Sequence, residues 1–386
     1  MEKKRIAVLT ATRAEYGILR PLIERIYADK DLELSLLVTG AHLSAEFGNT
    51  CQEIADDGFP IAVKIPILES GDTAAAVSRT MANALDGFGK YFEKHRAQML
   101  VVLGDRYETI AVCLAAMNAR IPIAHIHGGE ITEGAVDDVI RHAITKLSYL
   151  HFPSTQDYAK RIIQLGESPD RVFPVGALGV ENIRKVPLLS REELEASIGF
   201  SLEGDYAVVT FHPVTLEETG AEVQFQELLD ALDAFDMKYI ITKANADVDG
   251  RVINQMIDQY ASVHENVYTI ASLGMRRYLS AVRYCTMVIG NSSSGIIEAP
   301  SFQVPAVDIG DRQRGRTAAA SVIHCKADRE EIRKAMEEAV SMKRRLEKEP
   351  VQNPYEAEGT SEKIAAVCKD FLLHDRIDLK KTFYDI

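Results

Sequence analysis

The sequence predicts an α/β protein with two parallel sheets, each covered by helices on both faces. Short apolar runs alternate with helical patterns along the chain, and this repetition is typical of parallel sheets buried on both sides. The 386 residues, 46% of them hydrophobic, are enough for two or three domains, and we expect two. The alternation of strands and helices begins again after a proline-containing stretch of mixed charge, so we place a domain boundary near residue 180.

Apolar runs bounded by turn residues identify the strands, and apolar residues at helical spacing identify the helices. In the first half, strands are expected at 5–11, 32–40, 98–105, 121–129 and 149–155. Helices between them are expected at 17–29, 74–95 and 107–120. In the second half, strands are expected at 204–213, 238–245, 266–272, 286–293 and 304–310. Two further helices are expected at 328–349 and 360–373.

Charge and cysteine usage exclude several classes of protein. The net charge of −13 argues against a general nucleic-acid or anionic-membrane surface, although local basic pockets remain compatible with it. The five cysteines form no CxxC pair and are expected to be reduced and mostly packed. The basic start is followed by only a short apolar run, which we interpret as a first buried strand. These features predict a cytoplasmic protein without a membrane segment.

Polar residues that follow the strands are the candidates for function, because ligands of open parallel sheets bind outside the carboxyl ends of the strands. Arg13 stands before a helix, where it could bind a phosphate or only pair with Glu15 or Glu108. Asp105 leaves a nearly all-apolar strand, so it either caps the next helix or does chemistry. The adjacent Arg106 favours chemistry, because a second charge then points at the same cleft.

The segment HIHGGEITEGAVDDVIRH, which ends at His142, gathers histidines and carboxylates after another strand. His125 and His127 are expected on one face of that strand, with Glu130 in the loop beyond it. A zinc site would need three or four converging ligands, and neither HExxH nor a Cys/His spacing is present. His125 and His142 are therefore expected to be structural, satisfied by hydrogen bonds in or near the core. His127, Glu130 and Asp137, the last at a helix N-terminus, are the functional candidates.

The second half offers an anion site. His212 follows a strand and could donate to a phosphate oxygen or a leaving group. In VIGNSSSGIIEAP, Ser292 and Ser293 lie between a strand and a helix, where small residues let N–H groups surround an anion, although such turns are also ordinary helix caps. Glu298, in the first turns of that helix, could accept both hydroxyls of a ribose. Three arginines follow the last core strand, and at least one is expected to meet the phosphates and the others to form a solvated face: Arg312, Arg314 and Arg316.

With these residues in view, the chain resembles the UDP-N-acetylglucosamine 2-epimerase family, and more closely its hydrolysing branch, which supplies N-acetylmannosamine for sialic and related nonulosonic acids. The likeness covers about residues 4–370. It rests on TATRAEYG, GDRYE, HIHGGEITEGAVDDVIRHAITKLSYLHFPST, FHPVT, GNSSSGIIEAP and DIGDRQRGR. One departure is His127, where many members carry glutamate. The acid–base assignment among His127, Glu130 and Asp137 therefore stays open.

The resemblance implies a glycosyltransferase-B type architecture of two Rossmann-like domains. Sugar and catalytic loops are expected in 1–180 and the nucleotide in 181–365, with 366–386 packing back on the first domain. The residues expected to bind the UDP-sugar are Arg13, Arg106, His212, Asn245, Ser292, Ser293, Glu298 and Arg312. Those expected to act in catalysis are Asp105, His127, Glu130, Asp137 and His212.

The expected reaction starts with cleavage of the C1–O bond, because the C2 proton of the sugar is not next to a carbonyl. Elimination would give a 2-acetamidoglycal, and hydration would give the free 2-epimer and UDP. The substrate would be UDP-N-acetylglucosamine or a relative such as UDP-N,N'-diacetylbacillosamine, and neither a metal nor a redox cofactor is required. The alternatives are a non-hydrolysing epimerase, a glycosyltransferase and a nucleotide-sugar-binding regulator, and the long GGEITEGAVDD segment favours water. A homo-oligomer is also expected.

Overall fold

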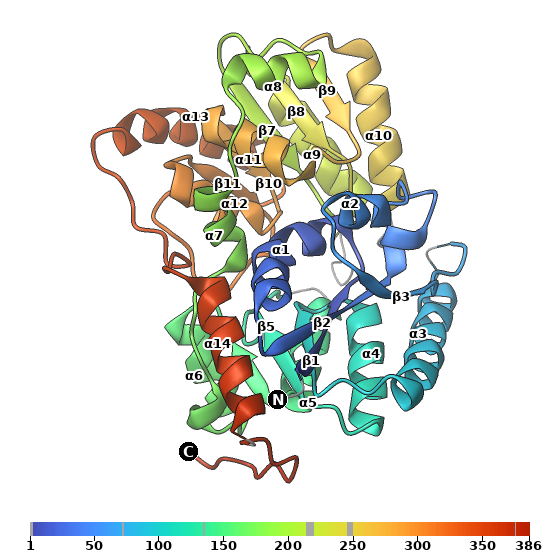
Figure 1. Cartoon of the computed structure of the whole chain (residues 1–386). Coiled ribbons are helices and arrows are strands. Elements are labelled where there is room, and N and C mark those ends of the chain that lie inside the picture. Colours follow the sequence, from blue (N-terminus) through green and yellow to red (C-terminus); the bar gives the residue numbers. More distant parts are fainter. Residues whose placement is uncertain (1–2, 72, 134–135, 214–219, 245–249, 375) are drawn as a thin grey trace. The chain divides into compact units, whose positions relative to one another are not determined.

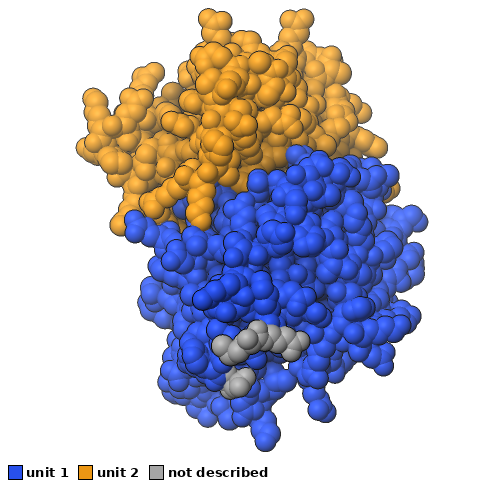
Figure 2. All heavy atoms as spheres, in the orientation of Figure 1, with its two compact units in different colours: residues 1–130, 137–182, 357–386 blue, residues 131–136, 183–356 orange. Residues whose placement is uncertain are grey.

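The computed structural model describes residues 3–71, 73–133, 136–213, 220–244, 250–374 and 376–386. The chain divides into two compact units, which Figure 2 shows in different colours. Unit 1 comprises Met1–Glu130, Asp137–Asn182 and Ala357–Ile386, and unit 2 comprises Ile131–Val136 and Ile183–Glu356. The short segment Ile131–Val136 therefore belongs to unit 2, although the chain on both sides of it belongs to unit 1.

Unit 1 contains a six-stranded parallel sheet in the order β3-β2-β1-β4-β5-β6. Figure 1 labels four of these strands, β1, β2, β3 and β5. The strands are β1 (Lys4–Thr10), β2 (Leu32–Thr39), β3 (Ile61–Ile65), β4 (Met99–Leu103), β5 (Ile123–Ile126) and β6 (Leu150–Phe152). The main helices are α1 (Arg13–Ala28), α2 (Cys51–Asp56), α3 (Ala74–Lys94), α4 (Tyr107–Asn118), α5 (Val136–Leu147), α6 (Gln156–Gln164) and α14 (Thr360–Leu373). The first five residues of α7 (Leu178–Lys185) belong to unit 1 and the last three to unit 2.

Both faces of the unit 1 sheet are buried against helices. Successive residues of a strand point to opposite faces, so they join different apolar clusters. In β1, Ile6 and Val8 join an apolar cluster with residues of α1 and α14, whereas Ala7 and Leu9 join a second cluster with residues of α3 and α4. A strand covered on both faces has no polar side to show. This is why the central strands could be recognised as nearly continuous apolar runs.

Unit 2 repeats this plan, with a parallel sheet in the order β12-β11-β10-β7-β8-β9. Its strands are β7 (Tyr206–Thr210), β8 (Lys238–Thr242), β9 (Val267–Ile270), β10 (Met287–Gly290), β11 (Ala306–Ile309) and β12 (Val322–Cys325). Its helices are α8 (Arg191–Ile198), α9 (Ala221–Leu232), α10 (Gly250–Val263), α11 (Gly274–Tyr284), α12 (Ser294–Ile297) and α13 (Arg329–Leu346). In the described part of the chain, none of the helices is long and apolar enough to cross a membrane.

Two edge strands have no counterpart among the expected strands, and several strands, β5 among them, end before the expected residue. β3 and β12 each pair with a single neighbour and have no fully buried residue, so they lack the apolar run that marks the inner strands. β5 was expected to reach residue 129 but ends at Ile126. The difference matters because the residues beyond Ile126 are candidates for function.

The strand order places a switch point at the same relative position in each sheet. β1 lies between β2 and β4, and β7 lies between β8 and β10. From β1 or β7, the next strands of the chain are added on one side, and the later strands are added on the other side. Ligands of doubly wound sheets bind at the carboxyl ends of the strands at such points. In unit 1 this position carries the segments after β1 and β4, and in unit 2 those after β7 and β10.

Candidate active site

A buried arginine on α5 joins two segments of unit 1. The Asp105 carboxylate, just beyond β4, accepts a hydrogen bond from Nη2 of Arg141. The same guanidinium donates through Nη1 to the Glu130 carbonyl oxygen at 3.1 Å and lies 3.5 Å from Oδ1 of Asp138. Because the Arg141 side chain is only 2% exposed, protein groups rather than water must balance its charge. Arg141 therefore fixes Asp105 relative to the peptide group of Glu130.

The Glu130 carboxylate is buried between the ends of two strands. Its Oε1 accepts a hydrogen bond from Oγ of Ser154, which follows β6, at 2.9 Å. The same oxygen lies 3.5 Å from Nδ1 of His127, which follows β5. A carboxylate, an imidazole and a hydroxyl within reach of one another can pass a proton. The structure therefore brings Glu130 and His127 together, with Asp105 connected to them through Arg141.

His127 lies outside the strand, so the prediction that His125 and His127 share one strand face is wrong. β5 ends at Ile126, and His127 has a φ of +65°, in the left-handed region. Its N–H donates to the Phe152 carbonyl oxygen at 3.0 Å, which continues the contact with β6 beyond the strand. Side chains no longer alternate between faces once the backbone leaves the extended conformation. This turn accounts for the approach of His127 to Glu130.

Gly129 allows the loop to pass close to α6. It has a φ of +78°, and a Cβ atom there would lie 2.5 Å from the Tyr158 carbonyl oxygen and 2.9 Å from Cγ1 of Ile162. The Gly129 carbonyl oxygen accepts a hydrogen bond from Nη1 of Arg161. Only glycine fits this position without a shift of the backbone, and such a shift would move the adjacent Glu130.

The other two histidines of this segment differ from each other. His125 is structural, as predicted: it is buried, with Nε2 2.7 Å from the Gly104 carbonyl oxygen and Nδ1 3.3 Å from Oγ1 of Thr145. Burial lowers the pKa of His125 to about 3, so it stays neutral at neutral pH. His142 is partly exposed instead, with Nε2 3.5 Å from Oδ2 of Asp138. Burial lowers the pKa of His142, and the nearby Asp138 carboxylate opposes this.

Asp137 stands in the first turn of α5, as the sequence predicted, and is partly buried. The neighbouring Asp138 lies near Arg141 and His142. Carboxylates at this end of a helix are stabilised by the helix dipole. Asp137 thus lies on the same helix as Arg141, the residue that binds Asp105.

Arg13 and Arg106 have different acidic partners. Arg13 binds Glu53 on α2 through two contacts of 3.0 and 2.6 Å, so the expected partners, Glu15 and Glu108, are not the ones it takes. Arg106 donates through Nε to Oε1 of the buried Glu108 at 2.6 Å. Burial raises the pKa of Glu15 to about 7, and the charge of Arg106 opposes this. Glu15 and Glu108 therefore both influence Arg106 electrostatically.

In unit 2, His212 is fixed by Asn291 across the switch point. The His212 N–H donates to Oδ1 of Asn291, and Nδ2 of Asn291 donates to the His212 carbonyl oxygen, both at 2.7 Å. Gly290 at the end of β10 has a φ of +130°, and a Cβ there would collide with the Thr210 carbonyl oxygen. The ends of β7 and β10 therefore meet closely, and the Asn291 amide holds the backbone at His212.

The serine turn after β10 has the expected position but a shorter helix than predicted. Ser292 and Ser293 precede α12, which has only four residues. Glu298 directly follows α12 as its C-cap rather than lying inside a longer helix. A helix of one turn contributes little dipole, because the macrodipole sums over aligned peptide groups. Most of the binding energy for an anion at this turn would therefore have to come from hydroxyl and arginine side chains.

The three arginines after β11 have three different environments. Arg312 donates through Nη1 to the Asn291 carbonyl oxygen at 2.9 Å, so it lies beside the serine turn. The Arg314 side chain is 66% exposed, as expected for a solvated face. Arg316 is partly buried and binds the segment 131–133, so it does not belong to a solvated face. Asn245, which the sequence also predicted to bind nucleotide, lies outside the described residues.

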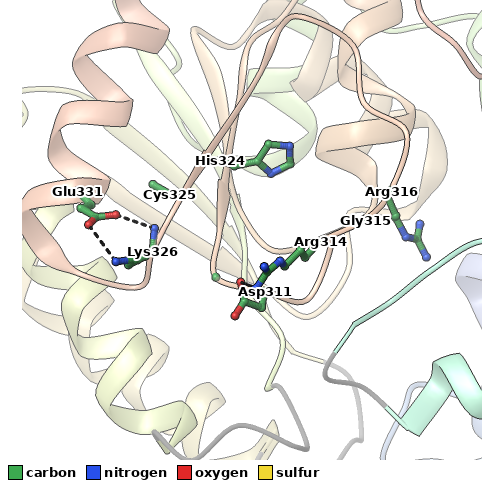
Figure 3. A pocket seen from close by; sticks show the side chains of 9 residues that line it. Asp311, Arg314, Gly315, Arg316, His324, Cys325, Lys326 and Glu331 are labelled. Carbon is green, nitrogen blue, oxygen red and sulfur yellow. Dashed lines mark hydrogen bonds and ion pairs between the residues drawn. The ribbon is translucent and has the colours of Figure 1, made fainter.

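A pocket of about 410 Å³ lies beside these arginines in unit 2 (Figure 3). His324 lines this pocket, and its Nδ1 lies 2.7 Å from Oδ2 of the buried Asp308. The hydrogen bond that the Asp308 carboxylate accepts raises the pKa of His324, although burial opposes this. The pocket is lined by Gly310, Asp311, Arg314, Gly315, Arg316, His324, Cys325, Lys326 and Glu331. Within the ranges that the structure describes, no group of three or more metal-ligating side chains is assembled.

Sequence reasoning missed the roles of Arg141, Ser154 and Arg316. Arg141 carried one signal, since it follows Asp138 by three positions on a helix that has Asp137 in its first turn. Ser154 and Arg316 carried none, because their partners are set by strand order and by contacts across the fold.

Comparisons with known proteins identify the family of the chain. A family model described as UDP-N-acetylglucosamine 2-epimerase matches residues 24–369. A GDP/UDP-N,N'-diacetylbacillosamine 2-epimerase (hydrolyzing) from Campylobacter jejuni is 41% identical over 325 residues, 84% of each chain. The polysialic acid biosynthesis protein P7 of Escherichia coli is 38% identical over 385 residues, which are 99% of this chain and 98% of the relative.

The fold is shared with solved structures at lower identity. The Methanocaldococcus jannaschii UDP-GlcNAc 2-epimerase, in complex with UDP-GlcNAc and UDP, aligns with a TM-score of 0.79 and 18% identity over 95% of this chain and 99% of that one. The predicted architecture of two Rossmann-like sheets is thus confirmed. By its match to the family model and its kinship with these relatives, the chain belongs to the UDP-N-acetylglucosamine 2-epimerase family, in its hydrolysing branch.

Proposed function

We propose that this chain hydrolyses a UDP-linked 2-acetamido sugar with inversion at C2, releasing the free 2-epimer and UDP. The observation that carries the proposal is the buried Arg141, which binds the Asp105 carboxylate and the carbonyl oxygen of Glu130. It gathers potential acid–base groups from the ends of neighbouring strands around one cation. Membership of the hydrolysing branch supports the same reaction class.

The chemistry begins at C1, because the C2 proton is not acidic in the intact sugar. The C1–O bond breaks and its electron pair leaves with UDP, while a base takes the C2 proton and a C1–C2 double bond forms. Water then adds its oxygen to C1, and a proton is delivered to C2 from the opposite face. The sum of these steps is one UDP-sugar and one water converted into one free 2-epimer and UDP.

Unit 1 supplies groups for the sugar chemistry in this proposal. The Arg141 guanidinium holds the Asp105 carboxylate in place, so Asp105 is suited to stabilise positive charge that develops at C1. Glu130 and His127, 3.5 Å apart, together with Asp137 are the candidates to exchange protons with C2 and with water. Two differently placed groups are required, because the proton leaves one face of the sugar and returns to the other.

Unit 2 supplies groups for the nucleotide. We propose that His212 and Arg312 stabilise the charge on the departing diphosphate, with hydroxyl donors from Ser292 and Ser293. The rigid pairing of Asn291 with the His212 backbone supports this, because a preorganised donor loses no energy to reorganisation. Glu298 would accept hydrogen bonds from the ribose. In unit 1, Arg13 and Arg106 would add positive charge for the diphosphate.

The sugar is proposed to be UDP-N-acetylglucosamine or its relative UDP-N,N'-diacetylbacillosamine. The first of these is supported by the family description and the second by the name of the Campylobacter jejuni relative. The two differ at positions 4 and 6 of the sugar, and a panel of UDP- and GDP-sugars would rank them by kcat/KM.

Incubation in heavy water tests the reaction itself. Purified protein and each UDP-sugar are mixed in D₂O, and the products are followed by NMR. Hydrolytic epimerisation gives free UDP and the 2-epimer with one deuterium at C2. A product that keeps its original C2 hydrogen would contradict the proposal. A 2-epimer still linked to UDP would indicate a non-hydrolysing epimerase, and transfer to an added acceptor would indicate a glycosyltransferase.

We also propose that the protein works in the cytoplasm and as a homo-oligomer. The cytoplasm is the compartment in which nucleotide sugars are available, and the five free cysteines suit its reducing conditions. Light scattering coupled to size-exclusion chromatography would give the oligomeric state.

A further inference from the structure

One loop of unit 2, residues 311–317 between β11 and β12, contacts two separate segments. In its first part, Nη1 of Arg312 and Nε2 of Gln313 donate to one acceptor, the Asn291 carbonyl oxygen, at 2.9 and 2.8 Å. Gln313 is buried, so this contact is shielded from water. The carbonyl immediately precedes Ser292, and the loop is therefore tied to the serine turn.

The second part of the same loop holds the segment 131–133. Arg316 donates through Nε to the Ile131 carbonyl oxygen at 2.9 Å and through Nη2 to Oγ1 of Thr132 at 3.2 Å. Thr132 is buried. Gly315 has a φ of +79°, and a Cβ there would lie 3.2 Å from Cγ2 of Ile131. The glycine thus permits the close approach that Arg316 needs.

The segment 131–133 continues the chain directly after Glu130. The Glu130 carbonyl oxygen is held by Arg141 at 3.1 Å, and the next carbonyl oxygen, that of Ile131, is held by Arg316 at 2.9 Å. Each guanidinium belongs to the same unit as the carbonyl it binds. Two successive peptide groups are therefore anchored, and the second anchor lies directly after Glu130.

We propose that Arg316 is a positioning residue that makes the placement of Glu130 depend on nucleotide at the serine turn. An anion at Ser292 moves or stiffens the loop through its contact with the Asn291 carbonyl, and Arg316 passes this to the segment 131–133. The inference rests on the proposed function for the role of Glu130. It adds a link between nucleotide binding and acid–base chemistry.

Arginine suits this role for a geometric reason. Its planar fork can bind a carbonyl and a hydroxyl at once, whereas a lysine ammonium on a flexible stem holds one acceptor with less directional control. Figure 3 shows the Arg316 guanidinium directed away from His324, which lines the same pocket. A shift of about 1 Å in a catalytic group can cost about 100-fold in rate. Loosening this contact should therefore reduce turnover more than it reduces binding.

The first test follows hydrogen exchange with UDP as the probe. In wild-type protein, UDP should protect peptides that cover 128–133 and 311–317. In Arg316→Gln, UDP should still protect 311–317, but protection of 128–133 should be lost, with the UDP dissociation constant changed less than about threefold. The control is Arg276→Gln, which removes a similar bond, from Nε of Arg276 to the Pro187 carbonyl oxygen at 2.7 Å, elsewhere in unit 2. It should behave as wild type.

The second test is kinetic. Arg316→Gln should lower kcat by about 10- to 100-fold with little change in KM. It should also release free 2-acetamidoglycal, because water adds to this intermediate slowly when Glu130 is misplaced. Arg316→Lys should lie between this variant and wild type. Thr132→Val removes one acceptor of the same contact and should show a smaller effect of the same kind.

The outcomes separate this inference from the proposed function. If wild type releases no UDP from any UDP-sugar, the proposed function fails, while the exchange experiment still tests the link with UDP alone. Weakened UDP binding in Arg316→Gln would make Arg316 a nucleotide ligand and would overturn its positioning role. Unchanged kcat and unchanged protection of 128–133 would also overturn it. If Arg316→Gln does not fold, Arg316→Lys and Thr132→Val decide by the same measurements.

Discussion

Nη2 of Arg141 donates to the Asp105 carboxylate, although the two residues stand 36 positions apart in the chain. The pair connects α5 with the end of β4, and the same guanidinium also binds the peptide group of Glu130. In a site whose proposed chemistry requires a fixed carboxylate near C1, this contact sets the geometry.

Replacing Asp105 with asparagine should abolish most turnover while UDP binding is kept. The amide cannot stabilise positive charge at C1, and we expect a fall in kcat of at least about 100-fold, the usual size of losing one electrostatic contact to a transition state. Arg141→Lys should give a smaller loss, since lysine keeps the positive charge but lacks the planar N–H donors of the guanidinium. Steady-state UDP release and calorimetric titration with UDP provide the measurements. An Asp105→Asn enzyme with near wild-type turnover would remove Asp105 from the mechanism.

Gly129→Ala should destabilise the protein more than Gly204→Ala does. Both glycines have a positive φ, +78° and +85°, but a Cβ at Gly129 meets the Tyr158 carbonyl oxygen at 2.5 Å, whereas Gly204 has open space. The left-handed conformation alone costs about 1–2 kcal/mol for alanine, so Gly204→Ala measures that cost and any excess at Gly129 measures the collision. Urea unfolding gives both values. Equal losses would show that the loop relaxes without strain.

Glu15 should make stability depend on pH in a defined window. Burial raises its pKa from 4.5 to about 7 in the folded protein, so the folded state holds this proton more tightly than the unfolded state. Its contribution is complete below pH 4.5 and is lost as the pH rises through about 7. The stability of Glu15→Gln relative to wild type should therefore increase across this window. Urea unfolding at several pH values tests this, and parallel profiles for the two proteins would contradict it.

The C-terminal tail should stabilise unit 1 through Lys381. Its Nζ lies 2.8 Å from Oε2 of the fully buried Glu167. Burial alone would raise the pKa of Glu167, but hydrogen bonds from His151, Lys146 and Lys381 outweigh it and lower the pKa to about 2. This stability is present above pH 4.5 and lost as the pH falls through about 2.

At pH 7, Lys381→Met should cost about 1–3 kcal/mol, because a buried carboxylate loses one of its donors. The matched change Lys160→Met removes an exposed pair with Asp157 and should cost less than about 1 kcal/mol. Thermal and urea unfolding distinguish the two. Similar small losses in both variants would mean that water replaces Lys381 beside Glu167.

The sequence by itself determined the fold class, the inner strands and the places where function should be sought. Strands buried on both faces have to be apolar throughout, so they stand out as uninterrupted runs, and their polar successors mark the carboxyl ends of the sheet. Asp105, Glu130 and Ser292 were all found in this way. The edge strands β3 and β12 were missed, because a strand with one neighbour and no fully buried residue carries a weaker pattern.

Only the tertiary structure decided which charges meet. Arg13 pairs with Glu53 rather than with Glu15 or Glu108, and Arg316 reaches Thr132 across 184 positions. A local pattern cannot specify such partners, because strand order and loop contacts bring them together after the chain has folded. The left-handed turn at His127 was hidden for a related reason: contacts with β6 and α6 hold this loop, and they overrule the local preference of the sequence.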